Sequence, residues 1–425
     1  MNFEPTMHKL SNGVTVILDP MDVATAEVSV CFKTGGLDEQ PNEYGLTHFC
    51  EHMFCKGTAR FPTKRIAMDY IADNGGSSNA QTSLFRLEFV GRIVARNLPI
   101  LIDFIADEIK NPLFDADMIE NERGVVIEEL RRSLSRDSTK MRLFVDKNLY
   151  DLYVPEGSVV LGNAGTINSF TRNQMLDFVS RRLSAHNCLV CVSGKIENSA
   201  QLLQQLEQSF AFLPTHDVTV KLDLNYTPHV LHNFMPERKT VVLEILFPDL
   251  WDDTPENMYK NICVGKFKKC LRQRLFDVLR SENGLTYDVG SSGYGTRFSG
   301  VSGTRIETSA ENVARAVALI AKTAHKVYSG GQPTDDDLAR YRNQNELADA
   351  NFLENNAERC SRLVGDWLFW DKVYDFNQHK QMSDTATSAD VVKYSRGCFD
   401  GAISIITHGP KFDGDLKQIW YDNFK

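Results

Sequence analysis

Residues 47–58 read THFCEHMFCKGT and hold two histidines four residues apart, with a glutamate directly before the second. In a helix, positions i and i+4 lie on one face, so His48 and His52 would present two imidazoles to one point. Imidazole is a preferred zinc ligand, and catalytic zinc usually takes three protein ligands. Glu51 borders the same face and could take a proton from a metal-bound water. The pattern predicts a hydrolytic zinc centre if a third ligand exists; the alternative is a capped helix with two incidental histidines.

The segment DADMIENERGVVIEELRRS, residues 115–133, offers candidates for the third ligand. Read as a helix, it places Glu122 and Glu129 on a stripe with apolar residues and Glu128 on a polar, solvated stripe. A carboxylate on an apolar stripe is costly unless it is paired or binds a metal, so Glu129 is the favoured ligand. Glu122 could orient a histidine or the water from behind the ligands. Two glutamates bridged to arginines, or Cys55 as a rival thiolate ligand, are the alternatives.

The amino-acid composition and net charge limit the classes of protein to which this chain could belong. The chain has 425 residues with 47 basic and 56 acidic side chains, a net charge of −9. This balance disfavours a nucleic-acid partner and is compatible with cationic peptides. We see no targeting segment and no apolar run near 18 residues, so no membrane association is expected. The nine scattered cysteines favour free thiols in a reducing compartment, and therefore a cytoplasmic location.

The order of predicted elements indicates an α+β fold with two related domains. Strands are expected at 13–20, 24–36 and 79–94, and helices at 45–57 and 62–76. A polar stretch with prolines follows, and the order then restarts with a strand at 239–250, a helix at 255–280 and a long strand at 284–308. We expect a catalytic domain at 1–215, a linker at 216–232 and a related domain at 233–425. Each would be a largely antiparallel sheet packed with helices.

These motifs together resemble the pitrilysin-type inverzincins, in the branch that contains mitochondrial processing peptidase and its bacterial relatives. HxxEH is followed after 76 residues by Glu129, and HKLSNGVTVIL, TGGLDEQPNEYGLTHFCEHMFCKGT and NAQTS resemble the opening strand, active-site helix and substrate-side strand of that family. The resemblance covers nearly the whole chain. It implies one zinc per chain bound by His48, His52 and Glu129, with Glu51 as the general base. Cys50 and Cys55 depart from the apolar residues usual there, which opens a route to thiol oxidation beside the metal.

Two further segments are candidates for substrate binding. LRSENGLTYDVG, residues 279–290, resembles the family's Arg/Tyr motif, in which Arg280 and Tyr287 would hold the peptide and support the developing oxyanion. The alternative is an ordinary helix end followed by a sheet residue. GGSSNAQTS could be an edge strand that pairs with an extended peptide, with Asn79 and Ala80 as contacts, or simply the edge of a hairpin.

The expected function is therefore a zinc-dependent endopeptidase that hydrolyses unfolded peptides through a zinc-bound water activated by Glu51. The alternative is a catalytically silent, assembly-type subunit of the same family. A structural zinc domain is disfavoured because it gives Glu51 no role. The second half has no HxxEH and would form a chamber wall. The resemblance implies a homodimer with a composite site, and a heterodimer with a ligand-less relative stays open.

Overall fold

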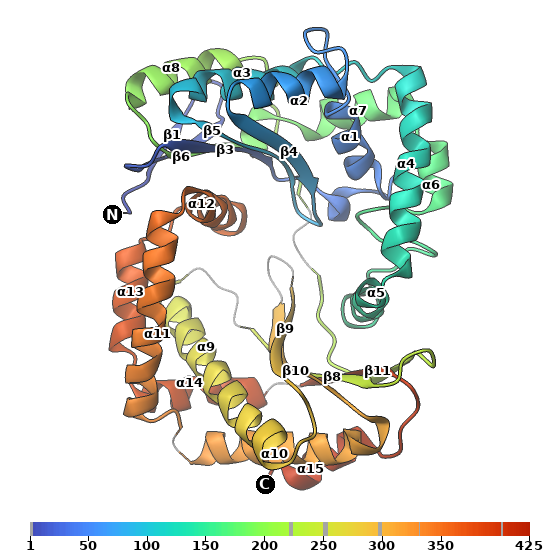
Figure 1. Ribbon diagram of the computed structural model, residues 1–425, viewed down its shortest axis with the longest axis vertical. Helices are drawn as coiled ribbons and strands as arrows, with labels where there is room; N and C mark the ends of the chain where they lie inside the picture. Colours follow the sequence, from blue (N-terminus) through green and yellow to red (C-terminus); the bar gives the residue numbers. More distant parts are fainter. Residues whose placement is uncertain (1–2, 221–223, 250–253, 296–299, 331, 401–402) are drawn as a thin grey trace. The chain divides into compact units, whose positions relative to one another are not determined.

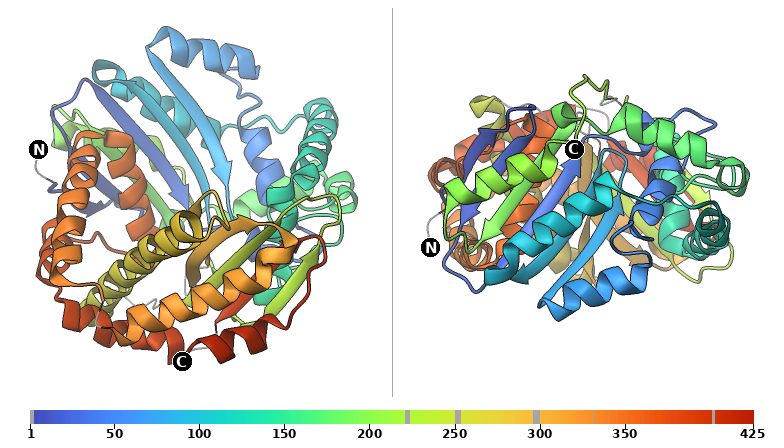
Figure 2. Two further views of the ribbon diagram at one scale, coloured as in Figure 1. Left: turned by 60° about the horizontal axis from the view of Figure 1, so that its bottom comes forward. Right: turned by 90° about the horizontal axis from the view of Figure 1, so that it is seen from above.

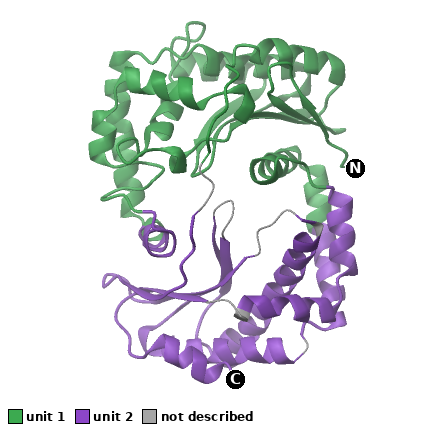
Figure 3. Ribbon diagram, turned by 180° about the vertical axis from the view of Figure 1, so that it is seen from behind, with its two compact units in different colours: residues 1–139, 153–222, 348–374 green, residues 140–152, 223–347, 375–425 purple. Residues whose placement is uncertain are grey.

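The computed structural model describes residues 3–220, 224–249, 254–295, 300–330, 332–400 and 403–425. The chain divides into two compact units, coloured green and purple in Figure 3. The first comprises residues 1–139, 153–222 and 348–374, and the second comprises residues 140–152, 223–347 and 375–425. Each unit contains one sheet covered by helices, which confirms the predicted α+β class.

The first unit is built on a six-stranded sheet in the order β1-β2-β6-β3-β5-β4. Only β2 and β6 pair in parallel. The strands are β1 (Thr6–Lys9), β2 (Thr15–Pro20), β3 (Thr25–Phe32), β4 (Gly76–Thr82), β5 (Leu87–Val94) and β6 (Cys188–Gly194). The helices are α1 (Leu46–Phe54), α2 (Lys64–Asp73), α3 (Leu98–Lys110), α4 (Ala116–Ser135), α6 (Ala164–Ser169), α7 (Arg172–Arg182), α8 (Ser199–Phe210) and α12 (Asn356–Trp370).

Helices cover both faces of this sheet. In the right view of Figure 2, α3 and α8 lie on one face, and Figure 1 shows α12 on the other, against β3 and β6. Every residue of β6 is buried, as expected for a strand with both faces covered. A fully buried ion pair joins the sheet to α12, because the guanidinium of Arg359 donates through Nε to Asp19 Oδ2 at 2.7 Å. A buried charge persists only when it is paired in this way.

The second unit is built on a five-stranded sheet in the order β7-β11-β8-β10-β9. Only β7 and β11 pair in parallel. The strands are β7 (Val230–Phe234), β8 (Val241–Pro248), β9 (Val289–Gly295), β10 (Gly300–Thr308) and β11 (Ser404–Gly409). The helices are α5 (Asp137–Tyr150), α9 (Pro255–Leu275), α10 (Val313–Ser329), α11 (Asp335–Glu354), α13 (Phe376–Thr385), α14 (Ser388–Asp400) and α15 (Leu416–Asn423). The long strand expected at 284–308 is two antiparallel strands, and residues 296–299 lie outside the described residues.

Both compact units draw on both halves of the sequence, which the expected boundaries at 215 and 233 do not describe. Helix α12 comes from the second half and packs on the first sheet, whereas α5 comes from the first half and packs on the second. A sheet with two apolar faces must pack against other elements on both of them. In each unit, one of these elements is a helix from the other half of the sequence. Residues 221–223 of the expected linker lie outside the described residues. Among the described helices, none is long and apolar enough to cross a bilayer.

Candidate active site

The active-site helix α1 is held at its N-terminus by a buried carboxylate. Glu39 accepts hydrogen bonds from the backbone N–H groups of Gly45 and Thr47 at 2.7 and 2.5 Å. Burial raises the pKa of Glu39 to about 8. Gly45 takes φ of 92°, and an added Cβ would lie 2.6 Å from the carbonyl oxygen of Leu161, so this turn requires glycine. The anchor and the turn fix where the helix starts.

Three side chains from α1 and α4 converge on one point. His48, His52 and Glu129 each offer a ligand atom within 4.8 Å of the others, the one such cluster in the described part of the chain. Glu129 Oε2 lies 3.9 Å from His48 Nε2 and 3.3 Å from His52 Nε2. Ligand atoms about 2.1 Å from a tetrahedral zinc are roughly 3.4 Å apart, so the donor set and its spacing fit zinc.

Burial favours the neutral form of His48, and a hydrogen bond sets the orientation of His52. Burial, with a smaller contribution from His52, lowers the pKa of His48 to about 3. His52 Nδ1 lies 2.7 Å from Glu122 Oε1, and this contact leaves Nε2 facing Glu129. Burial alone would raise the pKa of Glu122, but hydrogen bonds from His52 and Lys56 lower it. Glu122 is therefore an ionised acceptor that sets the orientation of His52.

Glu51 lies where α1 meets the edge strand β4. The hydroxyl of Thr82 donates to Glu51 Oε2 at 2.6 Å. Burial raises the pKa of Glu51, which makes its carboxylate a stronger base than an exposed one. Reasoning from the sequence missed Thr82 and Glu39, because both act through contacts with residues distant in the chain or across a loop.

The remaining candidates near the helix lie away from the cluster. Glu128 pairs with Arg131 on the solvent side of α4, and 69% of its side chain is exposed, as the helical stripe predicts. Cys55 caps the C-terminus of α1 and packs against the core. Cys55 is not part of the cluster formed by His48, His52 and Glu129, so the structure does not support it as the rival thiolate ligand, and burial raises the pKa of its thiol to about 12. Cys50 is fully buried in the same core.

Among the described strands, β4 has β5 as its one neighbour and so forms an edge of the first sheet, next to α1. The N–H of Ser83 donates to the carbonyl oxygen of Arg86, and the N–H of Val94 donates to that of Gly75; these two bonds set the alternation of the ladder. It follows that the backbone of Asn79 bonds to β5, whereas the N–H and C=O of Ala80 point out of the sheet. Asn79 offers an exposed side chain to a bound strand, and Ala80 offers its backbone.

Arg280 and Tyr287 form a pair in the second unit. The guanidinium carbon of Arg280 lies 4.7 Å from the centre of the Tyr287 ring, within range of a cation–π contact. Arg280 belongs to a π-helical turn, Phe276–Glu282, and such turns are frequent at functional sites. Tyr287 lies two residues before β9 rather than opening it, and 82% of it is exposed. The histidine cluster belongs to the first unit.

Comparison with known proteins gives two adjoining matches. A model described as insulinase (peptidase family M16) matches residues 15–154, and one described as the peptidase M16 inactive domain matches residues 169–345. An uncharacterized zinc protease of Rickettsia bellii is 23% identical over 95% of this chain and 97% of its own length. Mitochondrial-processing peptidase subunit beta of Dictyostelium discoideum is 29% identical over 49% of this chain and 44% of its own. A protease structure from Helicobacter pylori has the same fold, with a TM-score of 0.82 at 18% identity over 96% of this chain and all of that one.

Proposed function

Because this chain belongs to the insulinase family, peptidase family M16, we propose that it is a zinc-dependent endopeptidase acting on unfolded peptides. The observation that carries the proposal is the convergence of His48, His52 and Glu129 beside Glu51, a carboxylate that is not itself one of the three ligands. A structural zinc site would have no need of Glu51. A silent subunit would not need to keep three ligands and a base together.

Each residue of the site has a separate role in the proposed reaction. His48, His52 and Glu129 would hold the metal, and Glu122 keeps the imidazole of His52 turned toward it. Zinc, when bound, acidifies a water molecule and polarises the peptide carbonyl. Glu51, held by Thr82, takes the proton of the attacking water and returns it to the leaving amine.

The substrate would enter as an extended strand along β4. The outward backbone groups of Ala80 and the exposed side chain of Asn79 support this placement, since an added strand needs a free edge. Arg280 and Tyr287 would hold the peptide and support the oxyanion. We propose a homodimer in which these two residues complete the site of the partner chain. A cytoplasmic location is also proposed, supported by nine cysteines that are all free thiols.

The test compares Glu51→Gln with Glu128→Gln. Bound zinc is measured by metal analysis, and cleavage of a mixed peptide library is measured with and without a chelator. Glu51→Gln should keep its zinc and lose turnover by at least about a hundredfold, because an amide cannot accept the proton. Glu128→Gln should change neither. Cleavage by metal-free protein, or near wild-type turnover in Glu51→Gln, would reject the proposal.

A further inference from the structure

The two sheets match strand by strand except at one edge. The series β2-β6-β3-β5-β4 of the first unit and β7-β11-β8-β10-β9 of the second share the same order and the same parallel or antiparallel pairings. In the first unit, β1 pairs antiparallel with the outer side of β2. Among the described strands, β7 has β11 as its one neighbour, so its outer side lacks the strand that covers β2.

The free side of β7 presents a row of backbone groups. The bonds Ile405 N to His229 O and Met235 N to Gly409 O show that odd-numbered residues of β7 bond to β11. The N–H and C=O groups of Val230, His232 and Phe234 therefore point outward. Val230 and Phe234 also expose 36% and 51% of their surface. An unpaired edge of this kind is a template for another strand.

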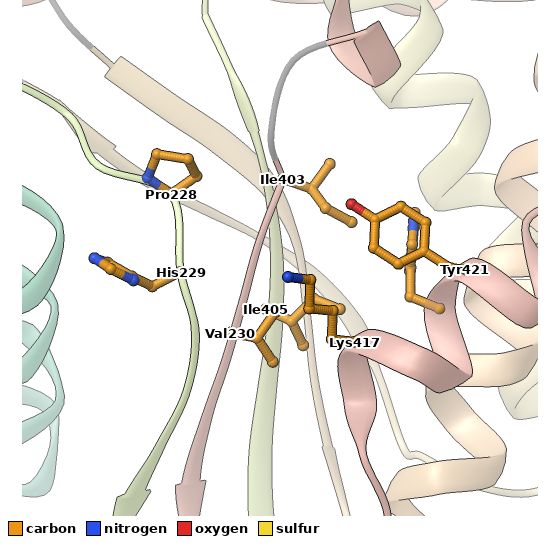
Figure 4. Close-up of a pocket in the computed structure, with 8 residues that line it drawn as sticks. Pro228, His229, Val230, Ile403, Ile405, Lys417 and Tyr421 are labelled. Atoms are coloured by element: carbon orange, nitrogen blue, oxygen red, sulfur yellow. The ribbon is translucent and has the colours of Figure 1, made fainter.

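Pockets flank the start of β7 on both faces of the sheet. One of about 340 Å³ is lined by Val230, Lys417 and Tyr421, and a second of about 530 Å³ is lined by the end of α5. His229 lines both. Figure 4 shows the side chains of His229 and Val230 on opposite sides of the strand. An added strand would place alternate side chains toward these two faces, so the pockets match its geometry.

Two lysine side chains lie at this edge. Lys417 lines the first pocket, and Lys411 lies 5.6 Å from the centre of the Phe234 ring. The second pocket is lined by one basic and one acidic side chain, Lys147 and Asp151. We propose that the outer edge of β7 binds an extended acidic peptide segment as an antiparallel strand, as β1 is bound by β2. This site lies in the second unit and depends on neither zinc nor cleavage.

A second copy of this chain fits the edge less well. Pairing of two β7 strands about a two-fold axis would centre on His232 and bring the same basic residues of both copies to one seam. Like charges at a strand seam are unfavourable, whereas acidic side chains would be attracted. The charge pattern thus favours a foreign acidic segment.

The experiment uses the full chain carrying Glu51→Gln, so that the probe is not cleaved. The probe is fluorescein-labelled Glu-Val-Glu-Val-Glu-Val-Glu with blocked ends, and the lysine-for-glutamate peptide is the ligand control. Fluorescence anisotropy gives affinity, and hydrogen exchange at single-residue resolution gives the position. We expect the acidic peptide to protect the amides of Val230, His232 and Phe234, and the lysine peptide to leave them unchanged.

Two variants test the contacts against matched controls. Lys417→Glu should weaken binding about threefold, the scale of an exposed ion pair, and Lys9→Glu on β1 should not. Val230→Pro removes an outward N–H without breaking the β7–β11 ladder and should weaken binding about fivefold at unchanged melting temperature. Protection confined to β4, or equal affinity for both peptides, would overturn the proposal. Protection of the β7 amides by dimerisation alone would overturn its assignment to a peptide.

Discussion

Removal of the Glu122 carboxylate tests how far the zinc affinity depends on a residue that does not touch the metal. Glu122 is 3% exposed and its Oε1 lies 2.7 Å from His52 Nδ1. In Glu122→Ala this nitrogen loses its acceptor, and the imidazole is free to turn away from Glu129. Lys56 loses its partner as well, but its side chain is 28% exposed and can reach water.

The expected loss of zinc affinity can be estimated from the hydrogen bond between Glu122 and His52. A hydrogen bond to a charged group contributes about 1.5–3 kcal/mol, which is roughly 10- to 150-fold in a binding constant. Acceptors behind a metal-bound histidine typically change metal affinity by 10- to 100-fold. We therefore expect Glu122→Ala to weaken zinc binding by about a hundredfold. Glu122→Gln keeps an acceptor without the charge and should lose only about tenfold.

The assay is competition for zinc with a chromophoric chelator, at fixed pH and salt. Glu128→Ala is the control, since that carboxylate lies on the same helix and is 69% exposed. Circular dichroism of the metal-free proteins checks that the fold is retained. A folded Glu122→Ala variant with zinc affinity within about twofold of wild type would refute the assigned role of Glu122 in orienting His52.

Other predictions concern stability, pH and assembly. Asp19→Ala removes the carboxylate that neutralises the buried guanidinium of Arg359 and should lower the free energy of unfolding by about 3–5 kcal/mol in urea titrations. Burial raises the pKa of Glu108 to about 8, so the native state keeps a proton that the unfolded state loses. This group alone should lower the free energy of unfolding by about 1.4 kcal/mol per pH unit between about pH 4.5 and 8. Burial raises the pKa of Glu39 to about 8 as well and adds a similar slope, so Glu108→Gln should reduce the slope in melting curves by about 1.4 kcal/mol per pH unit; an unchanged slope would contradict the argument. Mixing inactive Glu51→Gln and Tyr287→Phe chains should restore part of the peptidase activity if the site is shared between protomers, and no recovery despite verified subunit exchange would contradict the composite site.

The local geometry of the candidate site could be predicted from the spacing of residues in the sequence. The helical repeat places His48 and His52 on one face and separates Glu129 from the exposed Glu128, because side-chain direction along a helix follows from 3.6 residues per turn. The alternation of strands and helices likewise determined the α+β class, and the motifs identified the family, as the matches over both halves confirm.

Contacts between residues that are distant in the sequence could not be predicted in this way. Helices α12 and α5 each cover a sheet built mainly from the other half of the chain. Which sheet each helix covers depends on which apolar surfaces are complementary in shape. The contacts of Thr82 with Glu51 and of Glu122 with His52 arise in the same way. The unpaired edge of β7 also could not be predicted from the sequence, since the residues of a strand are the same whether or not a second strand pairs with it. Local periodicity fixes side-chain direction, but long-range contacts depend on how whole elements pack, and no spacing along the chain encodes that.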